Sequence, residues 1–330
     1  MPENADLFGE LVHSLALPLS RLLAGLSAGL MLAGLLESLN WARFLAAPTR
    51  PLARLAHLGE VSGAAFALAF AAPAAANSLL AHAHSEGRIS GRELTLANLF
   101  NSLPAYLMHT PSIFLLAWPA LGRPAAVYVG LTLLAAAART GFTIALGALT
   151  LPAPQPAANQ ANAAPRIPHS GKRLRETFQD ALGTAWRRFT RRLVRLVLFT
   201  VPIYTLMYVL QRTGQFALLE AWLSAHIAWL GFLKPEAASV IALHLAAEFG
   251  AALGAAGFAL QHGALSPRDI VLALMAGNIL STPVRALRHQ LPVYSGIFRP
   301  ALALKLVCAN QALRAASMIV MTALYYYCTL

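Results

Sequence analysis

Long apolar runs separated by short polar segments dominate the pattern of this chain. An apolar helix of about 20 residues spans the hydrocarbon core of a bilayer. Runs of that length cover residues 11–37, 61–83, 124–150, 193–212, 236–261 and 300–327. The pattern therefore predicts an all-α, polytopic membrane protein. The composition agrees, because 12% of the residues are charged and soluble domains carry about a quarter.

Two further apolar stretches, residues 94–118 and 270–298, are interrupted by polar side chains and contain two prolines each. Proline removes a backbone donor and weakens a helix. Irregular backbone at membrane depth must be covered by protein or line a water-filled cavity. We expect each stretch to form a broken, re-entrant hairpin. Residues 41–57, which carry three arginines, are expected to form an interfacial segment.

The chain divides into two similar halves on either side of a linker. With a shift of 176 positions, residues 87–97 align with 263–273, and five of the eleven positions are identical. Each stretch contains a serine N-cap, Ser90 or Ser266, followed three residues later by an acidic residue, Glu93 or Asp269. We predict a first repeat at 1–150, a linker with a basic amphipathic helix at 151–192, and a second repeat at 193–330.

Basic residues indicate how the halves face. If the broken stretches enter and leave on one side, each half crosses three times and the two repeats are inverted. The linker 151–192 and the turn around Arg288 are then cytoplasmic, whereas 84–93 and 213–235 are outside, as the positive-inside rule favours. If the broken stretches cross fully, the halves are parallel and the arginines of 38–60 lie outside.

The net charge of +12 fits cytoplasmic loops and anionic lipid better than nucleic acid. We therefore expect a multi-pass protein of a bacterial-type inner (cell) membrane. Its expected partners are the lipid bilayer and a small polar solute or ion, with a homo-oligomer left open and no nucleic acid.

A family resemblance starts from the segment GRISGRELTLANLFNSLPAYLMH, residues 87–109, which follows a spanning helix and an amphipathic surface segment. This order resembles the Gate, or nucleoside-recognition, domain family. That family includes spore maturation proteins A and B and is related to the membrane part of ferrous-iron transporter B and to concentrative nucleoside transporters. The resemblance covers both halves and implies a nucleoside-like solute. The chain departs from the iron transporter because it has no GxxxxGK[ST] phosphate loop.

Polar side chains in and near the broken stretches are the candidate solute-binding groups. Asn, Ser and Thr both donate and accept hydrogen bonds, which suits an uncharged polar solute or a dehydrated cation. The alternative is that they cap the half-helices and satisfy the broken backbone. The candidates are Asn77, Asn101, Ser102, His109, Asn278, Ser281, Thr282 and Arg285.

Ionisable residues inside apolar runs are the candidate coupling groups. His244 and Glu248 are four residues apart and share a helical face, and Arg139 and Arg314 each lie near the middle of a run. A charge at the bilayer centre costs about 2.5–3.5 kcal/mol or more, so such residues are functional by default. The alternative is a buried ion pair that fixes helix packing.

No enzyme motif of the types GxSxG, HExxH or CxxC occurs. His82 and His84 lack a third ligand for a metal. We therefore expect no catalysis, metal or cofactor. The sequence predicts a transporter or gating component that works by alternating access between inverted repeats. The alternative is a membrane scaffold that recruits a partner or anionic lipid through its basic linker.

Overall fold

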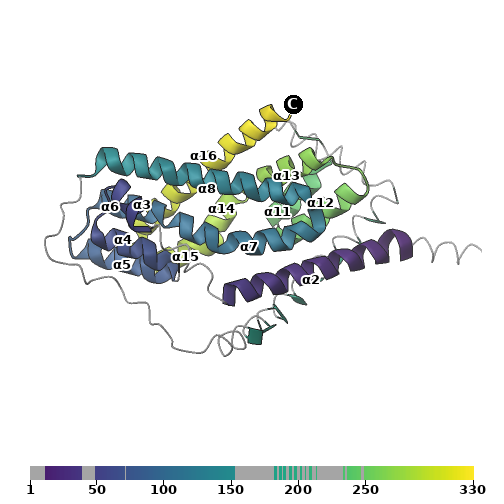
Figure 1. The fold of residues 1–330 in the computed structure, drawn as a ribbon, viewed down its shortest axis with the longest axis horizontal. Coiled ribbons are helices and arrows are strands. Elements are labelled where there is room, and N and C mark those ends of the chain that lie inside the picture. Colours follow the sequence, from purple (N-terminus) through teal and green to yellow (C-terminus); the bar gives the residue numbers. More distant parts are fainter. Residues whose placement is uncertain are drawn as a thin grey trace, which may run out of the picture.

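The computed structural model describes residues 12–38, 49–70, 72–152, 233–246 apart from 235, and 249–330, with scattered positions between 182 and 213. This part of the chain is all-α, as predicted, and contains no strand. A short π-helical turn, Val12–Ala16, leads into α2, Leu17–Ser38, which packs along α7. The remaining helices form two groups with α7, α8 and α16 running between them (Figure 1).

From α4 on in the first half and from α11 on in the second, the described elements follow the same order. In the first, α3 (Thr49–Leu55) precedes α4 (Glu60–Ala69), α5 (Pro73–Ser85), α6 (Gly91–Phe100), α7 (Ser102–Leu121) and α8 (Arg123–Thr150). In the second, α11 (Ala237–Ala246), α12 (Phe249–Gln261) and α13 (Pro267–Leu280) are followed by α14 (Thr282–Arg285), the π-helical turn η4 (Ala286–Gln290), α15 (Leu291–Ser295) and α16 (Pro300–Cys328).

The last helices of the two halves, α8 and α16, pack against each other and run in opposite directions (Figure 1). One hydrophobic cluster joins α11–α13 to the first part of α8 and to Met318 in the second half of α16. A second cluster joins α4–α6 to Ile144 near the end of α8 and to Ala303 near the start of α16. We call these two regions the α11–α12 end and the α4–α5 end of the molecule.

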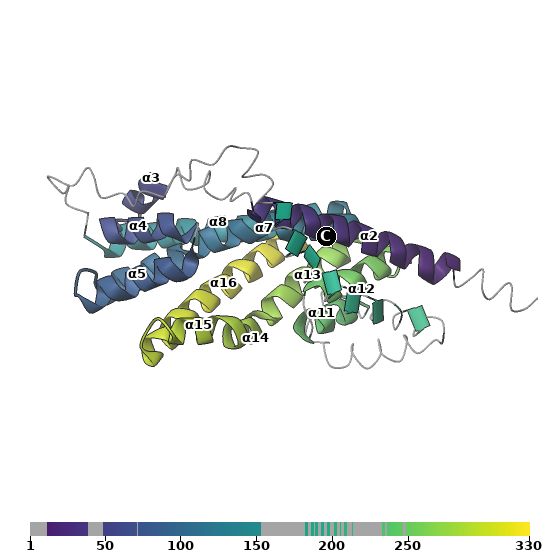
Figure 2. The same ribbon diagram turned by 90° about the horizontal axis from the view of Figure 1, so that it is seen from below.

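Two of the apolar runs predicted as spans fold instead as pairs of short helices. Residues 61–83 form α4 and α5, which pack side by side, and residues 236–261 form α11 and α12 (Figure 2). The first break has a clear cause: Ala72 leaves the helical region (φ −148°, ψ 83°) and Pro73 begins α5. A helix of ten to thirteen residues reaches only about 15–20 Å, so neither member of a pair would span a bilayer.

The hairpins predicted at 94–118 and 270–298 are wrong, because the chain does not reverse direction within these stretches. Their breaks fall at Asn101 and Ser281, and both residues keep near-helical dihedrals (φ −63°, ψ −10° and φ −75°, ψ −6°). The α6 helix packs on α4, α5 and α8, and α7 leads away from it (Figure 1). Each stretch is therefore a kinked helix, since a proline near the start of the second piece removes a donor without reversing the chain.

Residues 84–93 also lie elsewhere than predicted. They were expected on the opposite side from 38–60, yet the Gly59 backbone N donates to Glu93 Oε1 at 3.0 Å. His57 Nδ1 in turn lies 3.2 Å from the Leu151 carbonyl oxygen. The starts of α4 and α6 and the end of α8 thus share the α4–α5 end.

Both predicted serine caps are present. Ser90 accepts a hydrogen bond from the Glu93 backbone N, and Ser266 forms a complete capping box with Asp269. The acidic side chains also hold the first helix of the neighbouring pair. Glu93 accepts from Ser62 Oγ at 2.7 Å in α4, and Asp269 lies 2.8 Å from Lys234, just before α11.

Two helices among the described residues, α8 and α16, are long and apolar enough to cross a membrane. Their outward faces are apolar: Leu134 and Phe142 on α8 are 56% and 54% exposed, and Val320 on α16 is 59% exposed. Exposed apolar faces of this extent mark contact with a partner or a membrane. Their inward faces, by contrast, carry polar side chains that meet in one cavity.

Candidate functional site

A cavity of about 700 Å³ lies where the two halves meet. It is lined by the kink of the first broken helix, by residues on either side of the kink of the second, and by the innermost turns of both short-helix pairs. The first half contributes Pro73 and Asn77 of α5, and the second contributes His244 of α11 and Phe249 of α12. Segments that are far apart in the sequence therefore converge on one space in the middle of the fold.

The long helices α8 and α16 supply two polar stripes to the cavity. On α8, Tyr128, Thr132 and Arg139 follow helical spacing, and on α16 Asn310 and Arg314 do the same. Residues three, four or seven apart lie on one helical face. Each helix therefore turns polar groups inward and apolar groups outward, which is the reverse of a helix on a soluble protein.

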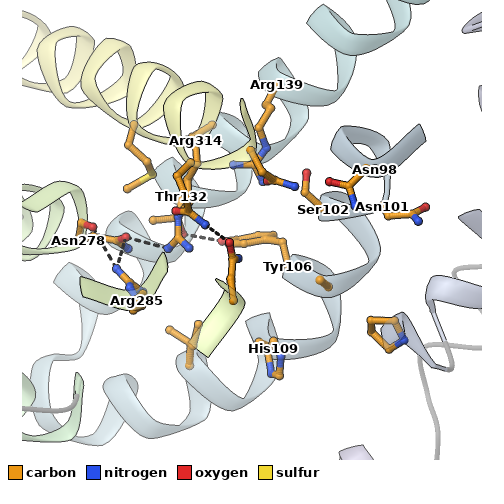
Figure 3. Close-up of a pocket in the computed structure, with 18 of the residues that line it drawn as sticks. Asn98, Asn101, Ser102, Tyr106, His109, Thr132, Arg139, Asn278, Arg285 and Arg314 are labelled. Atoms are coloured by element: carbon orange, nitrogen blue, oxygen red, sulfur yellow. Dashed lines mark hydrogen bonds between the residues drawn. The ribbon is translucent and has the colours of Figure 1, made fainter. Parts of the chain in front are cut away.

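Asn278, three residues before the kink at Ser281, joins three elements (Figure 3). Its Nδ2 donates to Tyr128 Oη at 2.7 Å. Its Oδ1 accepts from Arg285 Nη2 at 2.9 Å and from Arg314 Nη2 at 3.0 Å. One amide thus orients two guanidinium groups and links the second half to α8.

Asn98 has the corresponding place in the first half, three residues before the kink at Asn101. Its Nδ2 donates to Asn77 Oδ1 at 3.0 Å and also lies 3.1 Å from Tyr294 Oη on α15. Like Asn278, Asn98 bonds across the boundary between the halves. The two asparagines therefore form matching links on the two sides of the cavity.

Several buried polar atoms around the cavity have no hydrogen-bond partner among the described residues. They include both amide atoms of Asn101, Nε of Arg139 and of Arg285, and Nδ1 of His244. Asn101, Arg139 and His244 are 8%, 6% and 6% exposed. Buried polar groups are almost always bonded. Unpaired groups gathered around one cavity are therefore suited to bind what enters it.

The structure brings most of the predicted residues to this cavity. Its lining includes six of the predicted solute-binding residues and three of the predicted coupling residues: Asn77, Asn101, Ser102, His109, Asn278 and Arg285, then Arg139, His244 and Arg314. Ser281 and Thr282 do not line it. Their hydroxyls donate to the Asn278 carbonyl oxygen, 3.1 Å away in each case, so they satisfy the broken backbone. Glu248 lies outside the described residues.

The sequence reasoning missed Asn98, although a signal was present. Residues 98–102, NLFNS, align with 278–282, NILST, when the shift is 180 instead of 176. The extra four residues are the additional turn of α13, which has 14 residues against 10 in α6. Asn310 and Gln311, which also line the cavity, were visible as two adjacent amides inside the apolar run 300–327.

No group of three potential metal-ligating His, Cys, Asp or Glu side chains occurs among the described residues. Arginine, amide and hydroxyl groups dominate the polar lining instead. The amides and hydroxyls can donate hydrogen bonds as well as accept them, and the guanidinium groups can only donate. The arrangement is therefore suited to hold a hydrogen-bond acceptor.

The chain is similar to two proteins of Methanocaldococcus jannaschii. It is 28% identical to the uncharacterised protein MJ0871 over 267 residues, which cover 80% of this chain and 79% of the relative. It is 25% identical to the uncharacterised protein MJ1556 over 245 residues, 74% of each chain. No family model matches the chain. No solved structure matches it either.

Proposed function

We propose that this protein is a multi-pass membrane carrier, or gating component, for a small polar solute or ion that binds in the cavity between two inverted repeats. The cavity carries the proposal, since it gathers unpaired buried polar groups between two helix kinks and two short-helix pairs. Broken helices at membrane depth are tolerated where they line such a cavity. In carriers built from inverted repeats, the binding site lies at the repeat interface.

The apolar outer faces of α8 and α16 support a membrane location. If the short pairs α4–α5 and α11–α12 are the re-entrant elements, each half has three crossings. In the first half these are α2, kinked α6–α7 and α8. In the second half kinked α13–α15 and α16 join the span that the sequence predicts at 193–212, which lies largely outside the described residues. The antiparallel directions of α8 and α16 match inverted repeats. Glu248, which stands in the sequence between His244 and Phe249, remains our proposed coupling residue.

The position of the basic linker predicts which end of the molecule faces the cytoplasm. The basic linker leaves the α4–α5 end after Leu151, so we expect that end, including the turn at 86–90, to be cytoplasmic. In a background with Cys308 and Cys328 replaced, a cysteine at Arg88 should resist a membrane-impermeant maleimide added to intact cells. A cysteine at His262, in an exposed turn of the α11–α12 end, should react. The reverse labelling pattern would contradict this topology.

Alternating access predicts that cavity positions react from both sides of the membrane. A cysteine at Ala105, which lines the cavity, should react with a small, impermeant methanethiosulfonate in both right-side-out and inside-out vesicles. A cysteine at Ala125, fully buried in the helix core, is the matched control and should react in neither. Protection of position 105 from both sides would favour a scaffold with a closed core and refute the carrier.

A further inference from the structure

Three arginines line the cavity, and among the described residues that line it there is no aspartate or glutamate. Arg139 comes from α8, Arg285 from α14 and Arg314 from α16 (Figure 3). Arg314 interacts electrostatically with both of the others. Counting Glu248 with them would still leave two of the three guanidinium charges without a carboxylate.

Like charges that are partly or fully buried together destabilise a fold unless something compensates them. Neutral groups orient the arginines: Asn278 accepts from both Arg285 and Arg314. Arg139 keeps a buried Nε without a partner among the described residues. Guanidinium groups bind carboxylate and phosphate oxygens through paired, charge-assisted hydrogen bonds. The site therefore contains positive charge that no described carboxylate of the lining compensates, together with an unpaired guanidinium donor.

The helix ends around the cavity show the same imbalance. The first turn of α5 lines it through Pro73 and Ala74, and no side chain caps that N-terminus. The carbonyl ends are satisfied instead, since Ser102 Oγ donates to the Leu99 oxygen and Arg285 donates to the Asn278 oxygen. Uncapped N-termini favour negative charge.

We propose that the cavity binds a small anion through a carboxylate or phosphate group, held by Arg139, Arg285 and Arg314. This inference rests on the proposed function in one respect: if the protein is a carrier, the bound anion is the solute that it moves. The expected ligand is organic, because Phe249, Ile113 and Met318 supply apolar wall beside the arginines. An uncharged nucleoside would leave the guanidinium charges uncompensated.

The test measures ligand-dependent melting of the purified full chain in detergent. Succinate and inorganic phosphate are the oxyanion probes, uridine is the uncharged probe, and potassium chloride at matched ionic strength controls for salt. We expect at least one oxyanion to raise the melting temperature above the chloride control. A ligand that binds only the folded state stabilises it in this way. The difference between the two oxyanions would separate a carboxylate site from a phosphate site.

Two charge-removing variants and one matched control locate the effect. In Arg139→Gln and Arg314→Gln, the half-saturating concentration of that oxyanion should rise about tenfold or more, since each loses a charge-assisted bond. Arg123→Gln, at an exposed arginine of the same helix α8, should stay within about twofold. If Arg139→Gln fails to fold, Arg139→Lys, which keeps the charge but loses the planar fork, is measured in its place and should also weaken binding.

The ligand-free variants give a second readout. Arg139→Gln should melt at or above the temperature of the parent chain, because it relieves repulsion from Arg314, whereas the loss of a structural ion pair would lower it. Any one of three results would overturn the inference. They are stabilisation by uridine alone, no response to either oxyanion beyond that to chloride, and an oxyanion affinity that is unchanged in both variants. If an oxyanion binds but position 105 is not labelled from both sides, the proposed carrier function is refuted and the anion site stands. If position 105 is labelled from both sides but uridine is the ligand that binds, the anion site is refuted and the carrier function stands.

Discussion

Asn278→Ala is expected to lower the free energy of unfolding by about 3 kcal/mol or more. The change removes the acceptor of Arg285 and Arg314 and the donor to Tyr128. Hydrogen bonds to charged groups contribute roughly 1.5–3 kcal/mol each, and a buried partner left unpaired costs its full desolvation. Thermal unfolding of the purified chain, followed by circular dichroism, measures the loss.

Asn101→Ala is the matched control, because it removes the same type of side chain at the kink of the first half. Asn101 is also buried, but neither of its amide atoms has a partner among the described residues. Its removal should therefore change stability by less than about 1 kcal/mol, since it breaks no bond. Equal losses from both substitutions would mean that the bonds of Asn278 do not organise the cavity.

Gly147→Ala is expected to destabilise the fold by about 2–3 kcal/mol or more. A Cβ at position 147 would overlap the backbone carbonyl of Ala56, where the chain after α3 crosses the end of α8. A backbone atom cannot move aside as a flexible side chain can, and overpacking typically costs 1–3 kcal/mol. The melting temperature of the variant is the measurement.

Gly141→Ala, six residues earlier on the same helix, tests that explanation. A Cβ there would meet no atom within 4 Å. Replacing an open helical glycine by alanine stabilises by up to about 1 kcal/mol. The two substitutions should therefore shift the melting temperature in opposite directions, and a decrease of similar size in both would exclude the close approach at Ala56 as the cause.

The sequence allowed the helical class, the serine caps and nine of the residues that line the cavity to be predicted, because each rests on local chemistry. Ser90 and Ser266 are read from their spacing to an acidic residue, and Arg139 and Arg314 stand out inside apolar runs. These signals do not depend on how the helices pack.

The direction of the chain at each break could not be predicted in this way. Pro73 and Pro104 look alike in an apolar run, yet the chain reverses before Pro73 and continues past Pro104. The difference lies in the preceding residues, since Ala72 leaves the helical region and Asn101 does not. Tertiary packing determines whether the chain reverses, since α5 packs back along α4, whereas α6 packs against α8.

The antiparallel arrangement of α8 and α16 has a kinetic consequence for the proposed carrier. A solute that approaches from the α4–α5 end meets the first half's short-helix pair and then the kink at Asn101. From the α11–α12 end it meets the second half's pair and the kink at Ser281. The entry and exit barriers are thus built from equivalent parts, so we expect the protein itself to rectify the flux little.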